Sequence, residues 1–316
     1  MTSLLIYKIL QLFAFMILGF VIVKAGVVKS EDSLPISKIS LYLLMPAAIV
    51  NAFNVDVDRN VLLGVVIAFA VAILIHVALL GVDAIFTRLS GGSAVERASV
   101  VYSNSGNLII PIVSFVLGGE WVIYSCAFLS VQNVFLWTHG IRLFSDGKRL
   151  HLKKILLNPN IIAVIFGIAL MLSGLKLPTF VSDVASSLGS MLGAVSMLIA
   201  GMLATDIKPK QMLARKRIYP ILLMRMIICP VLVLLMLTGI CALMRSVGLF
   251  ESIKLESLLL ISFLATITPS ASSVMQFAKI NGKETDLAAA INIFSTVISI
   301  LTMPLFVMLF EKIIGI

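Results

Sequence analysis

Hydrophobic runs of membrane-spanning length recur along the whole chain, separated by short polar stretches. An apolar helix needs about 20 residues, roughly 17 to 25, to cross the hydrocarbon core of a bilayer. The pattern therefore predicts an all-α polytopic membrane protein with ten transmembrane helices. The ten runs cover residues 4–24, 38–55, 61–83, 98–118, 121–143, 158–174, 185–205, 217–244, 256–278 and 286–310.

Composition supports a protein whose surroundings are lipid. Of the 316 residues, 60% are hydrophobic and 12% are charged, whereas soluble domains carry about 25% charged residues. The net charge of +9 would suggest nucleic acid in a soluble protein, but here the basic residues fall between the apolar runs. We therefore expect the lipid bilayer as partner and no nucleic acid. The first run exceeds a typical signal-peptide core and no small-x-small site follows it, so we interpret it as a retained helix.

Lys and Arg are distributed unevenly between alternate loops. With the N-terminus outside, the inside loops hold 17 of these residues and the outside segments hold 6. Cytoplasmic loops carry the excess of positive charge. We expect a multi-pass protein of the cell (plasma) membrane with both termini outside and the basic loop at 147–154 inside.

The basic loop also divides the chain into two halves of five helices each. We predict a first repeat at 1–146, a cytoplasmic loop at 147–157 and a second repeat at 158–316. A unit with an odd number of helices, repeated once, has to be inverted. In each half the fourth helix is interrupted by proline and small polar residues, in SNSGNLIIPIV (103–113) and TITPSASSVMQFAK (266–279). Paired interruptions of this kind indicate the binding site of a carrier.

The two interruptions carry the chemistry expected of an anion site. A proline inside a helix frees a backbone carbonyl, and irregular backbone at membrane depth is tolerated only against protein or a water-filled cavity. The helix N-termini that follow such breaks offer free N–H groups and a positive dipole end, which suit a carboxylate. The candidate substrate-binding residues are Asn104, Ser105, Gly106, Asn107, Pro111, Gln132, Pro269, Ser270, Ser272 and Ser273.

Other intramembrane polar residues have two readings. Asn51, Asn133 and Asn292 either contribute to the site or tie helices together. The ionisable residues His76, His139 and Arg225 are functional candidates, but His139 and Arg225 lie near enough to helix ends to extend into the interface. These six residues stay open at this stage.

Acidic residues are missing from the middle of the predicted helices. The carboxylates nearest to a membrane segment are Asp83 and Asp206, both at an edge. Coupling through a deep carboxylate is therefore disfavoured, and a substrate that is itself charged is favoured. Cys126, Cys229 and Cys241 are isolated in apolar surroundings and are interpreted as packing residues rather than disulfide or metal ligands. We expect no cofactor, with a sodium ion as the single candidate.

Several motifs together resemble the auxin efflux carrier family, which includes plant carriers and many bacterial members. The resemblance covers essentially the whole chain. It rests on the spacing from Asn104 to Pro111, on Gln132, on Pro269 to Lys279, and on the segments LMPAAIVNAF (44–53), NPNIIAVIFGIAL (158–170) and STVISILTMPLF (295–306).

The resemblance implies a ten-helix inverted-repeat fold similar to bile-acid/sodium symporters. It implies a scaffold domain from helices 1, 2, 6 and 7, a transport domain from helices 3–5 and 8–10, a crossing of helices 4 and 9 at Pro111 and Pro269, and a homodimer. Members move organic anions, auxin in plants and malate- or malonate-like acids in some bacteria. This chain departs from the plant carriers in its short central loop and in Ser-Ala-Ser-Ser after Pro269, which favours a small bacterial-type substrate.

The predicted function is secondary transport of a small organic anion by alternating access, with the substrate bound where helices 4 and 9 cross. The alternatives are a sodium- or proton-coupled symporter or antiporter of the same fold and a membrane sensor without transport. An enzyme is disfavoured because the chain contains neither G-x-S-x-G nor H-E-x-x-H.

Overall fold

The computed structural model describes residues 2–145, 157–206, 210, 212, 214–246 and 254–315, and this part of the chain contains helices and no strands. The predicted central loop at 147–157 falls outside the described residues except for its last position. Three π-helical turns, at Ser40–Leu44, Leu136–Gly140 and Met224–Ile228, lie within longer helices. The helices are α1 (Thr2–Lys24), α2 (Ser33–Ile39), α3 (Met45–Ala52), α4 (Arg59–Ser90), α5 (Ala94–Val101), α6 (Ser105–Val116), α7 (Val122–Phe135), α8 (Ile141–Phe144), α10 (Pro159–Ser173), α11 (Thr179–Ala204), α13 (Ile218–Leu223), α14 (Cys229–Ser246), α15 (Leu255–Ile267), α16 (Ser272–Ile280) and α17 (Thr285–Ile314).

Seven helices within the described residues are long and apolar enough to cross a membrane. They correspond to seven of the ten predicted runs. The other three runs contain the shorter apolar helices α6, α10 and α15. Two of these runs, 98–118 and 256–278, are each divided into two short helices by a break, so neither forms a continuous span.

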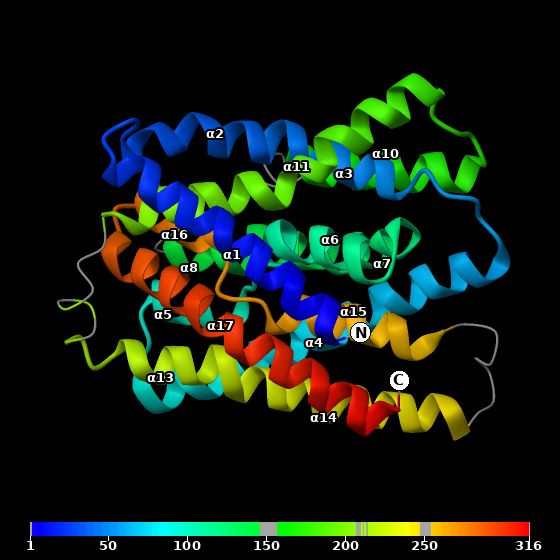
Figure 1. Cartoon of the computed structure of the whole chain (residues 1–316). Coiled ribbons are helices and arrows are strands. Elements are labelled where there is room, and N and C mark those ends of the chain that lie inside the picture. Colours follow the sequence, from blue (N-terminus) through cyan, green and yellow to red (C-terminus); the bar gives the residue numbers. More distant parts are fainter. Residues whose placement is uncertain are drawn as a thin grey trace.

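The helices pack in two groups (Figure 1). In one group α11 runs along α1 and also packs on α3, which contacts α10. In the other group α4 packs on α7, and α15 packs on α14, α17, α4 and α7. The groups meet where α6 and α17 contact α1 and α11. Figure 1 also shows that α1 begins and α17 ends toward the same end of the bundle.

Glycines make the closest approach inside the first group. A Cβ atom at Gly201 would overlap the carbonyl oxygen of Met16, and one at Gly19 would overlap that of Leu198. Glycine at these positions lets the backbones of α1 and α11 touch, as small residues do in many membrane helix pairs.

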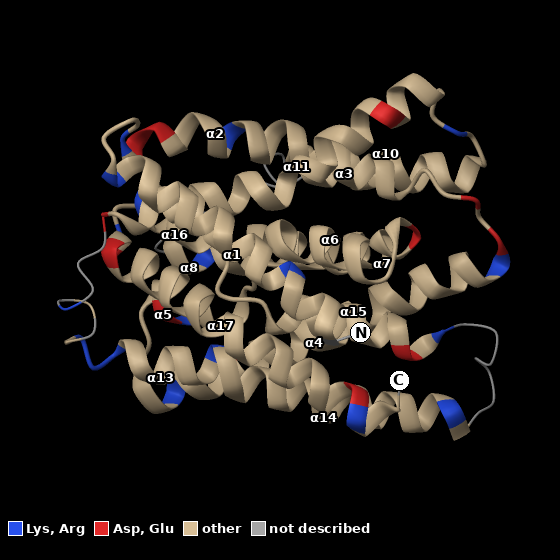
Figure 2. Cartoon of the chain, viewed as in Figure 1, with Lys and Arg blue, Asp and Glu red and all other residues tan. Residues whose placement is uncertain are grey.

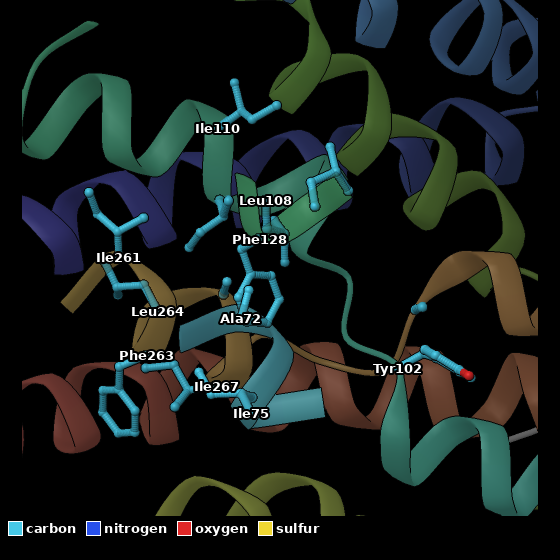
Figure 3. Close-up of a cluster of buried hydrophobic side chains, with 14 of the residues drawn as sticks. Ala72, Ile75, Tyr102, Leu108, Ile110, Phe128, Ile261, Phe263, Leu264 and Ile267 are labelled. Atoms are coloured by element: carbon cyan, nitrogen blue, oxygen red, sulfur yellow. The ribbon is translucent and has the colours of Figure 1, made fainter. Parts of the chain in front are cut away.

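Buried hydrophobic side chains of both groups form one core, and part of it lies between the helices of the second group. Figure 3 shows Ala72 and Ile75 of α4, Phe128 of α7 and Ile267 of α15 directed toward one another. Charged residues gather toward the two ends of the bundle, and the middle is largely uncharged (Figure 2). This distribution is what a helical protein surrounded by lipid requires.

In the first half the chain is interrupted several residues before Pro111, the position at which the sequence predicted the break. Pro111 is inside the continuous helix α6, and the chain is unwound at 102–104 instead. In the second half Pro269 is itself within the break, at 268–271. The expectation that both breaks are centred on their prolines is therefore wrong for the first one. The lost hydrogen bond at Pro111 frees only one carbonyl, which α6 accommodates without unwinding.

Candidate functional site

The two breaks cross each other in antiparallel orientation. Ser103 and Ser270 form an isolated antiparallel β-bridge. The Asn104 N–H donates to the Pro269 carbonyl at 2.8 Å, and the Ala271 N–H donates to the Tyr102 carbonyl at 3.0 Å. Two unwound segments thus satisfy part of each other's backbone, which explains how irregular backbone persists inside the bundle.

Gln132 of α7 holds the first break. Its side-chain Oε1 accepts from the Ser103 N–H at 3.3 Å and from the Ser103 hydroxyl at 2.6 Å, and its Nε2 donates to the Ser103 carbonyl at 2.8 Å. One amide therefore satisfies both backbone groups of Ser103. Gln132 is 4% exposed, so these bonds form out of contact with water.

Two residues of α17 hold the second break in the same way. The Asn292 side chain donates to the Ser270 carbonyl at 2.7 Å, and the Ser270 N–H donates to the Ser295 hydroxyl at 3.1 Å. From the sequence, Asn292 could either contribute to the site or tie helices together. The structure gives it a contact with the backbone of the crossing.

Arg225 lies beneath the crossing and is fully buried. Its guanidinium donates to the Val100 carbonyl at 3.2 Å, to the Thr268 carbonyl at 2.8 Å and to the Thr266 carbonyl. These three oxygens belong to the C-terminal ends of α5 and α15. Of the two interpretations left open for Arg225, extension to the membrane interface is wrong, because carbonyl groups left free by the two breaks bind it in the interior.

The helices that leave the crossing begin at Ser105 and Ser272. Within the described residues, neither the α6 nor the α16 N-terminus receives a side-chain cap. The Asn104 side-chain oxygen instead accepts from Asn107 Nδ2 at 3.1 Å. The uncapped N–H groups and the positive ends of the two dipoles remain available to a negative group.

Several polar side chains around these N-termini are buried without a partner in the described part of the chain. They include the hydroxyls of Ser105 and Ser270. Buried polar groups normally have a hydrogen-bond partner, so unpaired ones point to a bound water or ligand. Asn107, Ser272 and Ser273 are half-buried beside them.

Six of the ten predicted residues meet at the crossing or directly border it. They are Asn104, Ser105, Gln132, Pro269, Ser270 and Ser272.

The other four lie one step away, and two of them have evident packing roles. Asn107 and Ser273 follow in the first turns of α6 and α16. A Cβ atom at Gly106 would come within 2.9 Å of Met45 Cε, and Pro111 packs against Gly193 of α11. Gly106 and Pro111 thus contribute close packing against the first helix group.

A buried ion pair anchors α5, the helix that leads into the first break. Arg97 donates to both carboxylate oxygens of Asp83, with Nη2 at 2.7 Å from Oδ2, and Asp83 is 2% exposed. His139 lies beside this pair, with Nε2 at 3.7 Å from Asp83 Oδ2 and Nδ1 at 2.9 Å from the Tyr102 hydroxyl. His139 is partly exposed and joins a side-chain network instead of reaching freely to the interface.

The remaining polar candidates tie helices together or stay buried. Asn51 accepts from the Ser182 hydroxyl at 3.3 Å and thereby joins α3 to α11. His76 is within hydrogen-bond reach of the Ala72 carbonyl and stacks on Phe135. Asp206 accepts from the exposed Ser30 hydroxyl at 2.7 Å, as an edge residue would.

A small cavity separates the two helix groups next to α6. Its volume is about 20 Å³. It is lined mainly by apolar side chains of α1, α6 and α11 and by the hydroxyl residues Thr296 and Ser299 of α17. A space of this size accommodates about one water molecule.

Sequence reasoning missed the parts of the site that depend on distant segments. Ser103, Ser295 and the buried role of Arg225 were not predicted. Ser103 opens the stretch that was singled out, so its place at the crossing had a local signal. The sequence signal for Arg225 was weaker, because it was only a single cation in an apolar helix. The part played by Ser295 depends on the packing of α17 against the break.

Comparison with known proteins identifies the class to which the chain belongs. A family model described as "Membrane transport protein" matches residues 4–154 and 147–307. No curated protein matches the chain. The matches cover most of the sequence, so the chain belongs to the membrane transport protein family. Together with its apolar helices, this makes it a multi-pass membrane transporter, in a family of transporters and not of enzymes.

Proposed function

We propose that this member of the membrane transport protein family carries a small organic anion across the cell membrane, binding its carboxylate at the crossing of the two breaks. The observation that carries the proposal is the pair of uncapped helix N-termini beside unpaired buried hydroxyls, within the described residues. Helix N-termini bind anions through free N–H groups and the helix dipole. Asn104 and Asn107 would add side-chain donors to a bound carboxylate.

The organisation proposed for the carrier is that of a bacterial-type relative of auxin efflux carriers. It comprises ten helices in two inverted repeats, a homodimer, and both termini outside. The similar construction of the two breaks supports the repeat, since each is clamped by polar side chains of the helix that follows it in its half. The two packing groups support a scaffold domain around α1, α3, α10 and α11 and a transport domain formed by the remaining helices.

Transport by this site requires the two helix groups to separate. The cavity between them has a volume of about 20 Å³, which is too small for an organic acid and about right for one water. Substrate entry would therefore move α6 and α17 away from α1 and α11. Alternating access by movement of one helix bundle against another is common among inverted-repeat carriers.

The experiment that tests the proposal compares uptake by the wild type and by Asn104→Ala in proteoliposomes. The probes are radiolabelled malonate, malate and indole-3-acetate. The Asn104 side chain bonds only to Asn107 among the described residues, so we expect the melting temperature to change little. Uptake should fall at least about tenfold, because a hydrogen bond to a charged group contributes about 1.5–3 kcal/mol.

Asn51→Ala is the matched control, because it removes an asparagine that ties α3 to α11 away from the crossing. We expect it to lower the melting temperature and to leave substrate affinity unchanged. Wild-type protein that accumulates none of the three acids, or Asn104→Ala with full uptake, would contradict the proposal.

A further inference from the structure

The fully buried Arg225 raises a question that anion binding at the helix N-termini leaves unanswered. A buried guanidinium is costly unless its charge is balanced. Among the described residues no carboxylate forms an ion pair with it. Its partners are three backbone carbonyl oxygens, those of Val100, Thr266 and Thr268.

The three carbonyls belong to two helix ends that carry negative charge. The C-terminus of a helix is equivalent to about half a negative elementary charge. The α5 and α15 C-termini both end at the crossing, so together they present about one negative charge. The single positive charge of Arg225 balances it.

The same carbonyl oxygens are the ligands that a coupling cation would use. In carriers with broken helices, unwound carbonyls and half-helix C-termini coordinate the sodium ion or proton. Here the guanidinium of Arg225 already donates hydrogen bonds to such carbonyl oxygens on both broken helices. The described residues also contain no cluster of three or more His, Cys, Asp and Glu side chains that could hold a metal ion elsewhere.

We propose that Arg225 is a tethered counter-cation that takes the place of a coupling sodium ion at the crossing. The residue acts as a positioning residue. It neutralises the two helix C-termini and fixes the ends of α5 and α15, and so sets the geometry of the N-termini opposite them. Transport of the anion then requires no sodium. The transport part of this inference rests on the proposed function, whereas the cation site itself does not.

The test replaces the tethered cation by a free one. In Arg225→Ala the truncated side chain leaves space for a guanidinium ion between the same carbonyls. We expect this variant to have a lower melting temperature and to lose most of its uptake, and both to recover in part when guanidinium chloride is added at non-denaturing concentration. Urea, a neutral molecule of nearly the same shape, should restore neither. Arg225→Lys keeps the charge and should retain more uptake than Arg225→Gln.

Arg245→Ala is the matched control. Arg245 lies at the end of α14, is largely exposed and pairs with Glu256 of α15. Guanidinium should therefore change the melting temperature of Arg245→Ala no more than that of the wild type. For wild-type protein, replacing sodium by choline should leave the uptake rate unchanged.

Several results would overturn the inference. They are wild-type uptake that requires sodium, full activity of Arg225→Gln, and recovery of Arg225→Ala by urea as well as by guanidinium. If Arg225→Ala does not fold, the Lys and Gln variants and the sodium replacement still decide the question. If the wild type transports no organic anion, the proposed function fails, and the specific effect of guanidinium on the melting temperature still tests the cation site.

Discussion

The two breaks solve the same structural problem with different degrees of redundancy. At the first break one side chain, Gln132, satisfies both backbone groups of Ser103. At the second break the work is divided, since Asn292 bonds the Ser270 carbonyl and Ser295 bonds its N–H. Loss of one side chain therefore removes all the side-chain bonds to the backbone of Ser103 at the first break, but only one of the two bonds to the backbone of Ser270 at the second.

The breaks also differ in the side chains that follow them. The first continues into Asn104, Ser105 and Asn107, whereas the second continues into Ala271 and serines. Amides provide more donors and acceptors than hydroxyls. The first break therefore carries more hydrogen-bonding side chains, and the second contributes mainly backbone groups that bond to the first.

The largest effect is expected for Gln132→Ala. The change leaves the N–H and C=O of Ser103 without their side-chain partner. Each unsatisfied buried group costs about 1–3 kcal/mol, so we expect the free energy of unfolding to fall by about 2–6 kcal/mol. Uptake should be lost with it. Both are measured on purified protein, by denaturation in detergent and by proteoliposome flux.

Asn133→Ala provides the control for Gln132. This neighbouring residue is also buried, and its Nδ2 has no partner in the described part of the chain. Its removal should cost little or even stabilise the protein. Equal destabilisation by the two substitutions would show that the hydrogen bonds from Gln132 to the backbone of Ser103 are not what stabilises the first break.

A smaller effect is expected for Asp83→Asn. The substitution breaks the ion pair with Arg97 that anchors α5 ahead of the first break. Breaking a fully buried pair costs about 3–5 kcal/mol, and the partial exposure of Arg97 reduces our expectation to about 2 kcal/mol. The free energy of unfolding measures it, with Asp206→Asn, whose bond to Ser30 is exposed, as the control. Similar values for the two variants would contradict a buried anchor.

The smallest of these effects is expected for Asn292→Ala. The Ser270 carbonyl loses its donor, but Ser295 still accepts from the Ser270 N–H. One unsatisfied buried group should cost about 1–2 kcal/mol, with uptake reduced and not abolished. Ser299→Ala, one to two turns along α17, is the control. If Asn292→Ala proves as damaging as Gln132→Ala, the difference in redundancy between the two breaks does not exist.

Much of the fold could be predicted from the sequence because the signals are local. Apolar length predicted the long helices, and the polar stretches at 103–113 and 266–279 identified both broken helices. The exact position of the first break was missed, because Pro111 is a strong local signal and yet is tolerated inside α6. The unwinding at 102–104 is stabilised by contacts with Pro269 and Gln132, and neither contact is visible in the residues of the break itself.

The sequence by itself determined that this chain lies in a membrane and that two of its helices are interrupted, since both follow from the order and kind of the residues. The tertiary structure decided which groups satisfy the interrupted backbone. The pairing of Arg225 with the ends of α5 and α15 is the clearest case. A lone arginine in an apolar helix can reach an interface or a partner, and only the fold brings two helix C-termini to it, whose partial charges make its burial stable.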